Sequence, residues 1–124
     1  MSASSGTSAL IGAILATAGP AAKNRPMAVL PAFTFVATAV AAERCGYELQ
    51  FVDVDADTWM LNPAHIARLG SLEGVGLVIP VAPFGRPVPQ RDWKILSQAY
   101  RETEQPCVSN DREKRRPALI NCLE

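Results

Sequence analysis

Apolar runs alternate with short polar or Gly- and Pro-containing segments along the chain, and their lengths separate strands from helices. Short apolar runs between turn residues predict buried strands at residues 27–30 and 75–81. Residues 48–54 form a third predicted strand, and residues 106–108 are a candidate for a fourth. These four segments are well spaced along the chain, which leaves room for a helix before or between them.

Four helices are predicted in those intervals. The first follows Ser5 or Thr7, either of which can cap it, and Gly19-Pro20 ends it. The others are expected at residues 34–44, 62–69 and 90–103. The last of them places apolar side chains three or four positions apart, as an amphipathic helix does: Trp93, Leu96, Ala99 and Tyr100.

Alternation of helices with continuously apolar strands predicts an α/β fold around a mainly parallel sheet. In such sheets, ligands bind at the carboxyl ends of strands and at helix N-termini. Those two places are therefore where candidate chemistry is sought.

Composition excludes several classes of protein. The 124 residues suffice for one ordinary domain or part of a larger one, and 48% apolar with 19% charged residues argues against a disordered chain. Twelve basic residues balance twelve acidic ones, so no overall field attracts nucleic acid or an anionic membrane. The charges are uneven: residues 1–42 contain only Lys23 and Arg25, whereas residues 104–124 hold eight.

Cysteine usage and apolar segment length indicate a reduced, cytoplasmic protein without a membrane span. Cys45, Cys107 and Cys122 are odd in number and widely spaced, which implies no disulfide framework. The single histidine, His65, does not favour a zinc site. Residues 27–42 are uncharged but number only 16, which is short of a membrane span, and the N-terminus has no basic leader.

Two motifs offer groups that could hold a ligand. Ser5, Gly6, Thr7 and Ser8 open the first helix, where free N–H groups bind phosphate, although an ordinary helix cap has the same composition. Phe33 and Phe35 lie at the predicted turn from the first strand to the second helix, where an aromatic side chain can stack on a flat ring or can pack in the core.

Two further motifs shape the same region. Asp53, Asp55 and Asp57 alternate after the third predicted strand, but the segment lacks the Gly and distal Glu of an EF-hand, so a structural turn is favoured over a calcium loop. Residues 78–85, VIPVAPFG, end a strand in a Pro/Gly loop without a titratable group, and this loop is expected to shape a pocket.

In this order and spacing, four segments resemble the DegT/DnrJ/StrS sugar aminotransferases: SSGTSAL, PAFTFVAT, FVDVDADTWMLNP and VIPVAPFG. The resemblance covers roughly residues 4–103. It implies a pyridoxal 5'-phosphate (PLP) enzyme of the aspartate-aminotransferase fold, of which this chain would be part of the large domain. It further implies a homodimer that acts on an amino acid and a nucleotide-linked keto-sugar.

The resemblance also assigns cofactor-binding roles. Thr7 and Ser8 match the positions that hold the cofactor phosphate, and Gly6 allows close approach of the backbone. Phe35 matches the aromatic residue that stacks on the pyridine ring. Many members carry His at the position of Ala82.

The catalytic motifs of the family are missing from the sequence. None of the lysines, Lys23, Lys94 and Lys114, lies in the motif of the lysine that binds the cofactor covalently. Asp111 is near the place of the carboxylate that protonates the pyridine nitrogen, but a charge run follows it instead of small apolar residues.

We therefore expect no catalytic residue and weak or no binding of PLP. Residues 1–103 are expected to be a partial PLP-transferase domain, and residues 104–124 a polar tail that is unrelated to the family or out of register. The predicted function is a truncated, inactive remnant of a sugar aminotransferase. The alternative is a small non-enzymatic α/β module that binds an anion or a protein.

Overall fold

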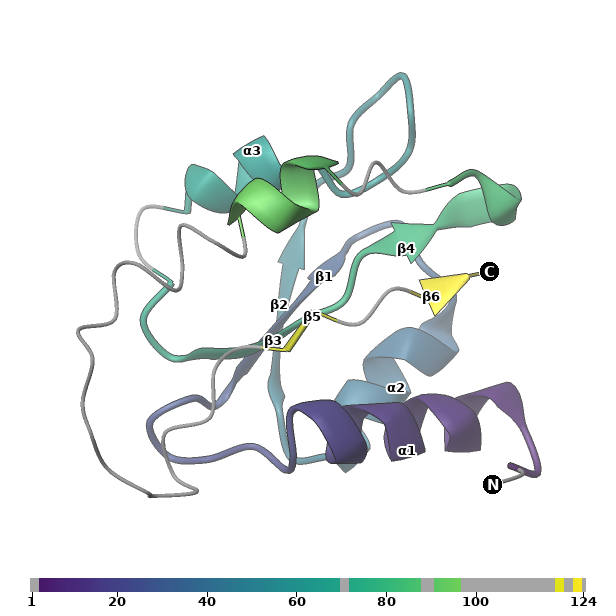
Figure 1. Cartoon of the computed structure of the whole chain (residues 1–124), viewed down its shortest axis with the longest axis vertical. Coiled ribbons are helices and arrows are strands. Elements are labelled where there is room, and N and C mark those ends of the chain that lie inside the picture. The colour runs from purple at the N-terminus through teal and green to yellow at the C-terminus, as the bar shows by residue number, and fades with distance from the viewer. Residues whose placement is uncertain (1–2, 70–71, 88–90, 97–117, 120–121, 124) are drawn as a thin grey trace.

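A parallel sheet is the centre of the computed structural model, which describes residues 3–69, 72–87, 91–96, 118–119 and 122–123 (Figure 1). Four strands form this sheet in the order β2-β1-β3-β5, and every pair is parallel. These strands are β1 (Met27–Pro31), β2 (Glu48–Val52), β3 (Val75–Val78) and β5 (Ala118–Leu119). A second parallel pair joins β4 (Val81–Ala82) to β6 (Cys122–Leu123).

Helices cover both faces of the sheet. Helices α1 (Gly6–Thr17) and α2 (Val36–Arg44) lie side by side on one face, and α3 (Pro63–Ala67) lies with the helical residues 91–96 on the other (Figure 1). A 3-10 turn, η1 (Pro83–Gly85), follows β4. This arrangement is the covering that parallel strands require, because both of their faces are apolar.

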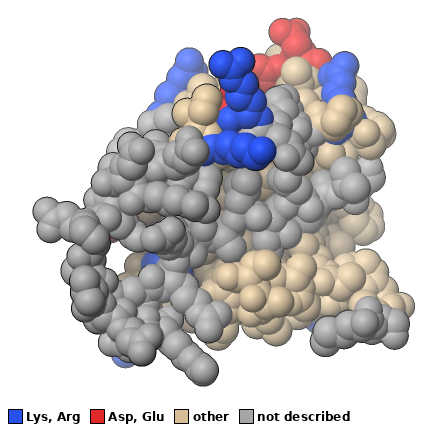
Figure 2. Space-filling view, in the orientation of Figure 1, with Lys and Arg blue, Asp and Glu red and all other residues tan. Residues whose placement is uncertain are grey.

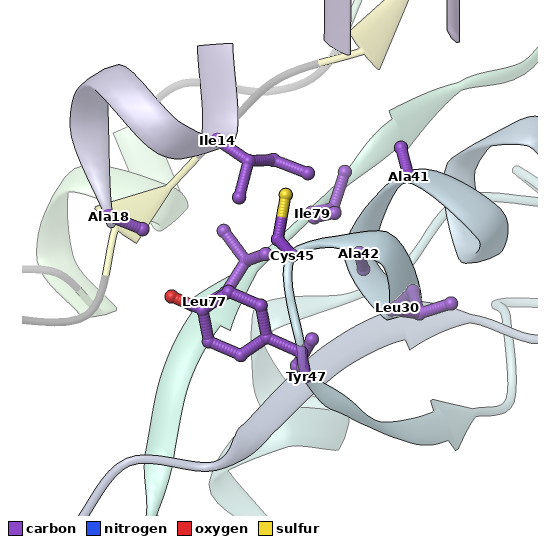
Figure 3. Close-up of a cluster of buried hydrophobic side chains, with 10 residues drawn as sticks. Ile14, Ala18, Leu30, Ala41, Ala42, Cys45, Tyr47, Leu77 and Ile79 are labelled. Carbon is purple, nitrogen blue, oxygen red and sulfur yellow. The ribbon is translucent and has the colours of Figure 1, made fainter. Parts of the chain in front are cut away.

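The core has two halves, one on each side of β1. Ala28 and Leu30 point into the cluster under α1 and α2, and Val29 between them points into the cluster under α3. Figure 3 shows the first cluster, in which Ile14 of α1 and Cys45 after α2 meet the sheet. The alternation follows from the two-residue period of a strand, which sends successive side chains to opposite faces.

Two hydrogen bonds tie the end of α1 to the start of β2. The buried Tyr47 hydroxyl donates to the Gly19 carbonyl oxygen at 3.0 Å, and the Ala21 amide donates to the Cys45 carbonyl oxygen at 2.9 Å. Burial raises the pKa of Tyr47, which keeps the hydroxyl proton available for this bond. Since β2 starts at the amino edge of the sheet, α1 ends at that edge and begins at the carboxyl edge.

The predicted fold class is confirmed, and most element boundaries agree within two residues. The third predicted strand ends at Val52 rather than residue 54, and the second helix begins at Val36 rather than residue 34. The prediction of one strand over residues 75–81 is wrong, because it splits into β3 and β4 around Pro80, which has no N–H to donate. The third helix ends at Ala67 rather than residue 69.

The carboxyl-terminal part of the chain is described in part. Residues 91–96 are helical as predicted, and the side chain of Trp93 among them is buried. Residues 97–103 and the candidate strand 106–108 lie outside the described residues. No strand is predicted from the sequence at β5 or β6, each of which has two residues. Both pair in parallel with earlier strands, β5 with β3 and β6 with β4.

Charge is distributed unevenly over the surface. In Figure 2 the visible Lys, Arg, Asp and Glu side chains gather over α3, residues 91–96 and the neighbouring loops, and the surface over α1 is nearly uncharged. This agrees with the scarcity of charged residues in the first 42 positions. Among the residues that the structure describes, no helix is long and apolar enough to cross a membrane.

We predict that Gly76→Ala destabilises the fold by about 1–3 kcal/mol, the usual cost of overpacking. A Cβ atom at this position would lie 2.7 Å from the Arg25 carbonyl oxygen and 2.9 Å from Cε1 of Tyr47. The backbone oxygen cannot move away without disturbing β1. Urea denaturation of both proteins measures the difference in the free energy of unfolding.

The matched control is Gly12→Ala. Nothing lies within 4 Å of a Cβ atom at Gly12, which is inside α1. Alanine is the better helix former, so this variant is expected to gain up to about 1 kcal/mol. Equal stability of the wild type and Gly76→Ala would contradict the close approach at β3.

Candidate cofactor site

The first turn of α1 is capped by Ser5. This residue has extended backbone, and its Oγ accepts a hydrogen bond from the Ser8 amide at 3.2 Å. The Ser5 and Ser8 hydroxyls also lie 3.0 Å apart, within hydrogen-bond distance. The predicted cap is therefore present, and it leaves the hydroxyl of Ser8 at the exposed tip of the helix.

The same turn has the chemistry that a phosphate group needs. The amides of Gly6 and Thr7 belong to the helix start, where backbone N–H groups have no acceptor inside the helix. Ser5, Gly6 and Ser8 are exposed, so this turn faces solvent. No acidic residue occupies the first turn, and the helix dipole is positive here. The exposed, uncharged first turn of α1 therefore fits a phosphate group.

Phe35 is presented by the connection between β1 and α2. It occupies the N-cap position of α2 with extended backbone, and its carbonyl oxygen accepts from the Thr38 amide at 3.0 Å. The Thr34 hydroxyl donates to the buried Thr38 hydroxyl at 3.1 Å, which fixes this turn from the inside. The Phe35 side chain is 66% exposed, so the core-packing alternative does not hold for it.

The four predicted cofactor residues lie at one edge of the molecule. Gly6, Thr7 and Ser8 are at the start of α1, which is at the carboxyl edge of the sheet because α1 ends at the amino edge. Phe35 lies four residues after the carboxyl end of β1 and caps the helix that packs beside α1. The fold thus brings both motifs to the same edge and to the same helical layer.

Phe33 does not join this group. Its ring centroid lies 5.5 Å from that of Trp59 and 6.5 Å from that of Phe84. No individual role is predicted from the sequence for Trp59 or for Phe84, which lies in the loop expected to shape a pocket. No sequence signal predicted their meeting, because they come from loops that follow different strands.

The acidic segment after β2 forms a closed turn. One carboxylate oxygen of Asp55 accepts from the Asp57 amide at 3.1 Å, the Thr58 amide at 3.0 Å and the Thr58 hydroxyl at 3.0 Å. These bonds, with those of Thr58 first, lower the pKa of Asp55. Among the described residues, no group of three or more His, Cys, Asp or Glu side chains could hold a metal ion. The three hydrogen bonds to Asp55 are those of a structural turn.

The lysines that the structure describes are away from the candidate site. Lys23 is exposed in the turn before β1, at the amino edge of the sheet. Lys94 is exposed on the helical residues 91–96, on the face opposite α1 and α2 (Figure 1). Lys114 and Asp111 lie outside the described residues.

Comparison with known proteins identifies the class. The model of the DegT/DnrJ/EryC1/StrS aminotransferase family matches residues 1–101, and the chain belongs to this family. The fold is that of the PLP-dependent aminotransferases, as the sequence resemblance implied.

Individual relatives share the fold over most of this chain. A putative PLP-dependent aminotransferase from Bacillus cereus ATCC 10987 is 30% identical, with a TM-score of 0.65 over 75% of this chain and 25% of that one. The sugar aminotransferase CalS13 from Micromonospora echinospora has a TM-score of 0.70 over 94% of this chain and 28% of that one. It is 22% identical, so this likeness shows the fold alone.

A curated relative adds a sequence match. Protein Rv3402c from Mycobacterium tuberculosis (strain ATCC 25618 / H37Rv) is 41% identical over 63 residues, which are 51% of this chain and 15% of that protein. The chain therefore matches between 15% and 28% of the length of these relatives.

We predict that Asp55→Ala loses stability in a pH-dependent way. The folded state lowers the pKa of Asp55 below its ordinary value of 3.8, so the carboxylate stabilises the fold above that value and loses this contribution as the pH falls through the lowered pKa. The difference in the free energy of unfolding between wild type and variant should therefore be largest near pH 7 and should narrow below about pH 4. Asp55→Asn retains an acceptor oxygen and should lose less at pH 7. A constant difference between pH 7 and pH 3 would contradict the role of the charge.

Proposed function

We propose that this chain is the cofactor-phosphate and ring-stacking portion of a sugar aminotransferase, and that it binds PLP without catalysing transamination. One observation carries the proposal. An exposed, uncharged helix start and an exposed aromatic ring lie at the same edge of the sheet, within the residues that match the family.

The proposed binding mode uses only residues at that edge. Thr7 and Ser8 donate their hydroxyls, with the first amides of α1, to the cofactor phosphate. Phe35 stacks on the face of the pyridine ring, and the Thr34–Thr38 hydrogen bond holds its turn in place. When bound, PLP supplies an electron sink for the transfer of an amino group. These contacts correspond to micromolar-to-millimolar affinity, or about −4 to −8 kcal/mol.

The proposed substrates of the parent activity are an amino acid and a nucleotide-linked keto-sugar. Support comes from the aminotransferase family to which the chain belongs. Transamination also needs a lysine at the cofactor and a carboxylate at the pyridine nitrogen. The two lysines of the described residues lie at the amino edge and on the opposite face, which supports the proposal that the chain is an inactive remnant.

The cell compartment and the assembly state belong to the same proposal. Burial raises the pKa of the Cys45 thiol, which makes it a poor nucleophile, and this fits a structural cysteine in a reducing cytoplasm. The homodimer of the family stays a prediction for this chain.

We predict that Thr7→Ala and Phe35→Leu each weaken PLP binding at least fivefold. The first removes a phosphate donor, and the second replaces the stacking face by an aliphatic side chain of similar bulk. Titration followed by the absorbance of PLP measures the dissociation constants. Phe51→Leu is the matched control, because Phe51 is an exposed aromatic on β2, and it should leave binding unchanged. Equal affinities for all four proteins would contradict the proposed site.

We further predict no transamination above that of free PLP. The contacts at α1 and Phe35 hold the cofactor but do not lower the barrier specifically, because no described lysine is placed to move the proton. The assay follows amino transfer from glutamate to keto-sugar nucleotides. Borohydride reduction with PLP, followed by peptide mapping, should give only scattered trace label. Stoichiometric label on one lysine, or turnover that falls in Thr7→Ala, would show that the chain has an active site.

A further inference from the structure

Strand β2 lies at an edge of the four-stranded sheet, where it pairs with β1 alone among the strands that the structure describes. Its register with β1 runs without a bulge from Glu48 to Val52. Edge strands of natural proteins are commonly protected by Lys, by Pro or by a bulge, and β2 (ELQFV) has none of these. Its outer side is therefore suited to pairing with a further strand.

The hydrogen bonds at the two ends of β2 show which of its backbone groups face β1. The Glu48 amide donates to the Pro26 carbonyl oxygen at 2.8 Å, and the Val52 carbonyl oxygen accepts from the Ala32 amide at 2.8 Å. In a parallel pair, residues two positions apart bond to the same neighbouring strand. Every second residue of β2 therefore faces β1, and the residues between them face outward.

Leu49 and Phe51 are the two residues whose backbone faces outward. No described strand lies on that side to receive their amides. The Phe51 carbonyl oxygen accepts only from a neighbouring side chain, Nε2 of Gln50, at 3.3 Å. The Phe51 side chain is 48% exposed, and Leu49 is partly buried against the core under α1 and α2. The open edge thus offers main-chain hydrogen-bonding groups beside an apolar side chain.

Acidic residues lie at both ends of this edge. Glu48 begins β2 and Asp53 directly follows it, and both side chains are exposed. The nearby end of α2 carries the exposed pair Glu43 and Arg44, whose charges offset each other. The charge along β2 is therefore negative, which attracts a cationic segment and disfavours an acidic one.

A second copy of the chain fits this edge less well than a basic segment does. Antiparallel pairing of two β2 strands about a two-fold axis at Gln50 would bring the Glu48 end of each copy to the Asp53 end of the other. Carboxylates would then meet at both ends of the contact, and such juxtaposed like charges are costly. The acidic ends of β2 consequently act against self-pairing.

We infer that β2 binds an extended, basic segment of a partner protein, which adds a strand to the sheet. Main-chain hydrogen bonds to Leu49 and Phe51 supply the affinity in this mode of recognition, and alternate side chains supply the specificity. An apolar side chain of the segment packs on Phe51, and basic side chains at its two ends pair with Glu48 and Asp53. The partner uses an edge that lies outside the candidate cofactor site, so its binding does not depend on PLP.

The test uses the full chain and two peptides with the same apolar residues and the same fluorescent label. One is Lys-Val-Thr-Val-Lys and the other is Glu-Val-Thr-Val-Glu, both with blocked ends. Fluorescence anisotropy should give a dissociation constant at least tenfold lower for the Lys peptide. In the double variant Glu48→Gln with Asp53→Asn, the two constants should lie within threefold of each other.

Hydrogen exchange distinguishes strand addition from a loose electrostatic contact. Saturation with the Lys peptide should slow exchange of the outward amides of Leu49 and Phe51 at least tenfold. The amides of Gln50 and Val52 face β1, so they are the internal control and should change less.

Two substitutions at Phe51 form a matched pair. Both Phe51→Pro and Phe51→Ala remove the ring, but only Phe51→Pro removes the outward amide. Proline is tolerated on an edge strand where its missing N–H faces away from the neighbouring strand. Phe51→Pro should bind the Lys peptide at least fivefold more weakly than Phe51→Ala, and PLP binding should be the same in both.

Equal affinity for the two peptides would overturn the inference. Unchanged exchange at Leu49 and Phe51 in the presence of saturating Lys peptide would also overturn it, and this measurement on the wild type decides the matter if Phe51→Pro does not fold. Dimerisation of the chain alone that Phe51→Pro abolishes would assign the edge to a second copy instead of a basic partner.

Discussion

The parallel pairing of β1 with β2 and β3 is the constraint on which the rest of the structure depends. A central parallel strand is apolar on both faces, so each face must be covered, and each connection must return the chain to the starting edge of the sheet. Helices α1 and α2 meet both needs on one face. They run against the strands, and their N-termini consequently gather at the carboxyl edge. The candidate cofactor site is a direct result of this chain direction.

The elements that the sequence predicts well are those with strong local signals. Ser5 caps α1, Asn62-Pro63 opens α3, and the apolar run of β1 lies buried between its neighbours. The predicted strand over residues 75–81 is wrong for a local reason that the apolar pattern of the sequence does not reveal. Pro80 is buried and apolar like its neighbours, but it interrupts the ladder after the Ile79 amide donates to the Val29 carbonyl oxygen.

The candidate site was predictable only in part. The residues of α1 and the connection after β1 are each contiguous in sequence, so a motif can find them. Phe33, Trp59 and Phe84 meet from three different loops, and Trp59 and Phe84 have a left-handed backbone that propensities do not anticipate. A strand pattern places Trp59 and Phe84 after strands, but only the register of the sheet and the hydrogen bonds of the Asp55 turn bring them into contact.

The hydrogen bond between Tyr47 and Gly19 holds the carboxyl-terminal end of α1 at the amino edge of the sheet. The helix has 12 residues and is therefore roughly 18 Å long, with its fixed end at the amino edge. A tilt of about 5° at that end would move the amides of Gly6 and Thr7 by on the order of 1.5 Å. The Tyr47 hydroxyl and the buried side chains of Ile14 and Ala18 thus together determine where the amino-terminal end of α1 lies.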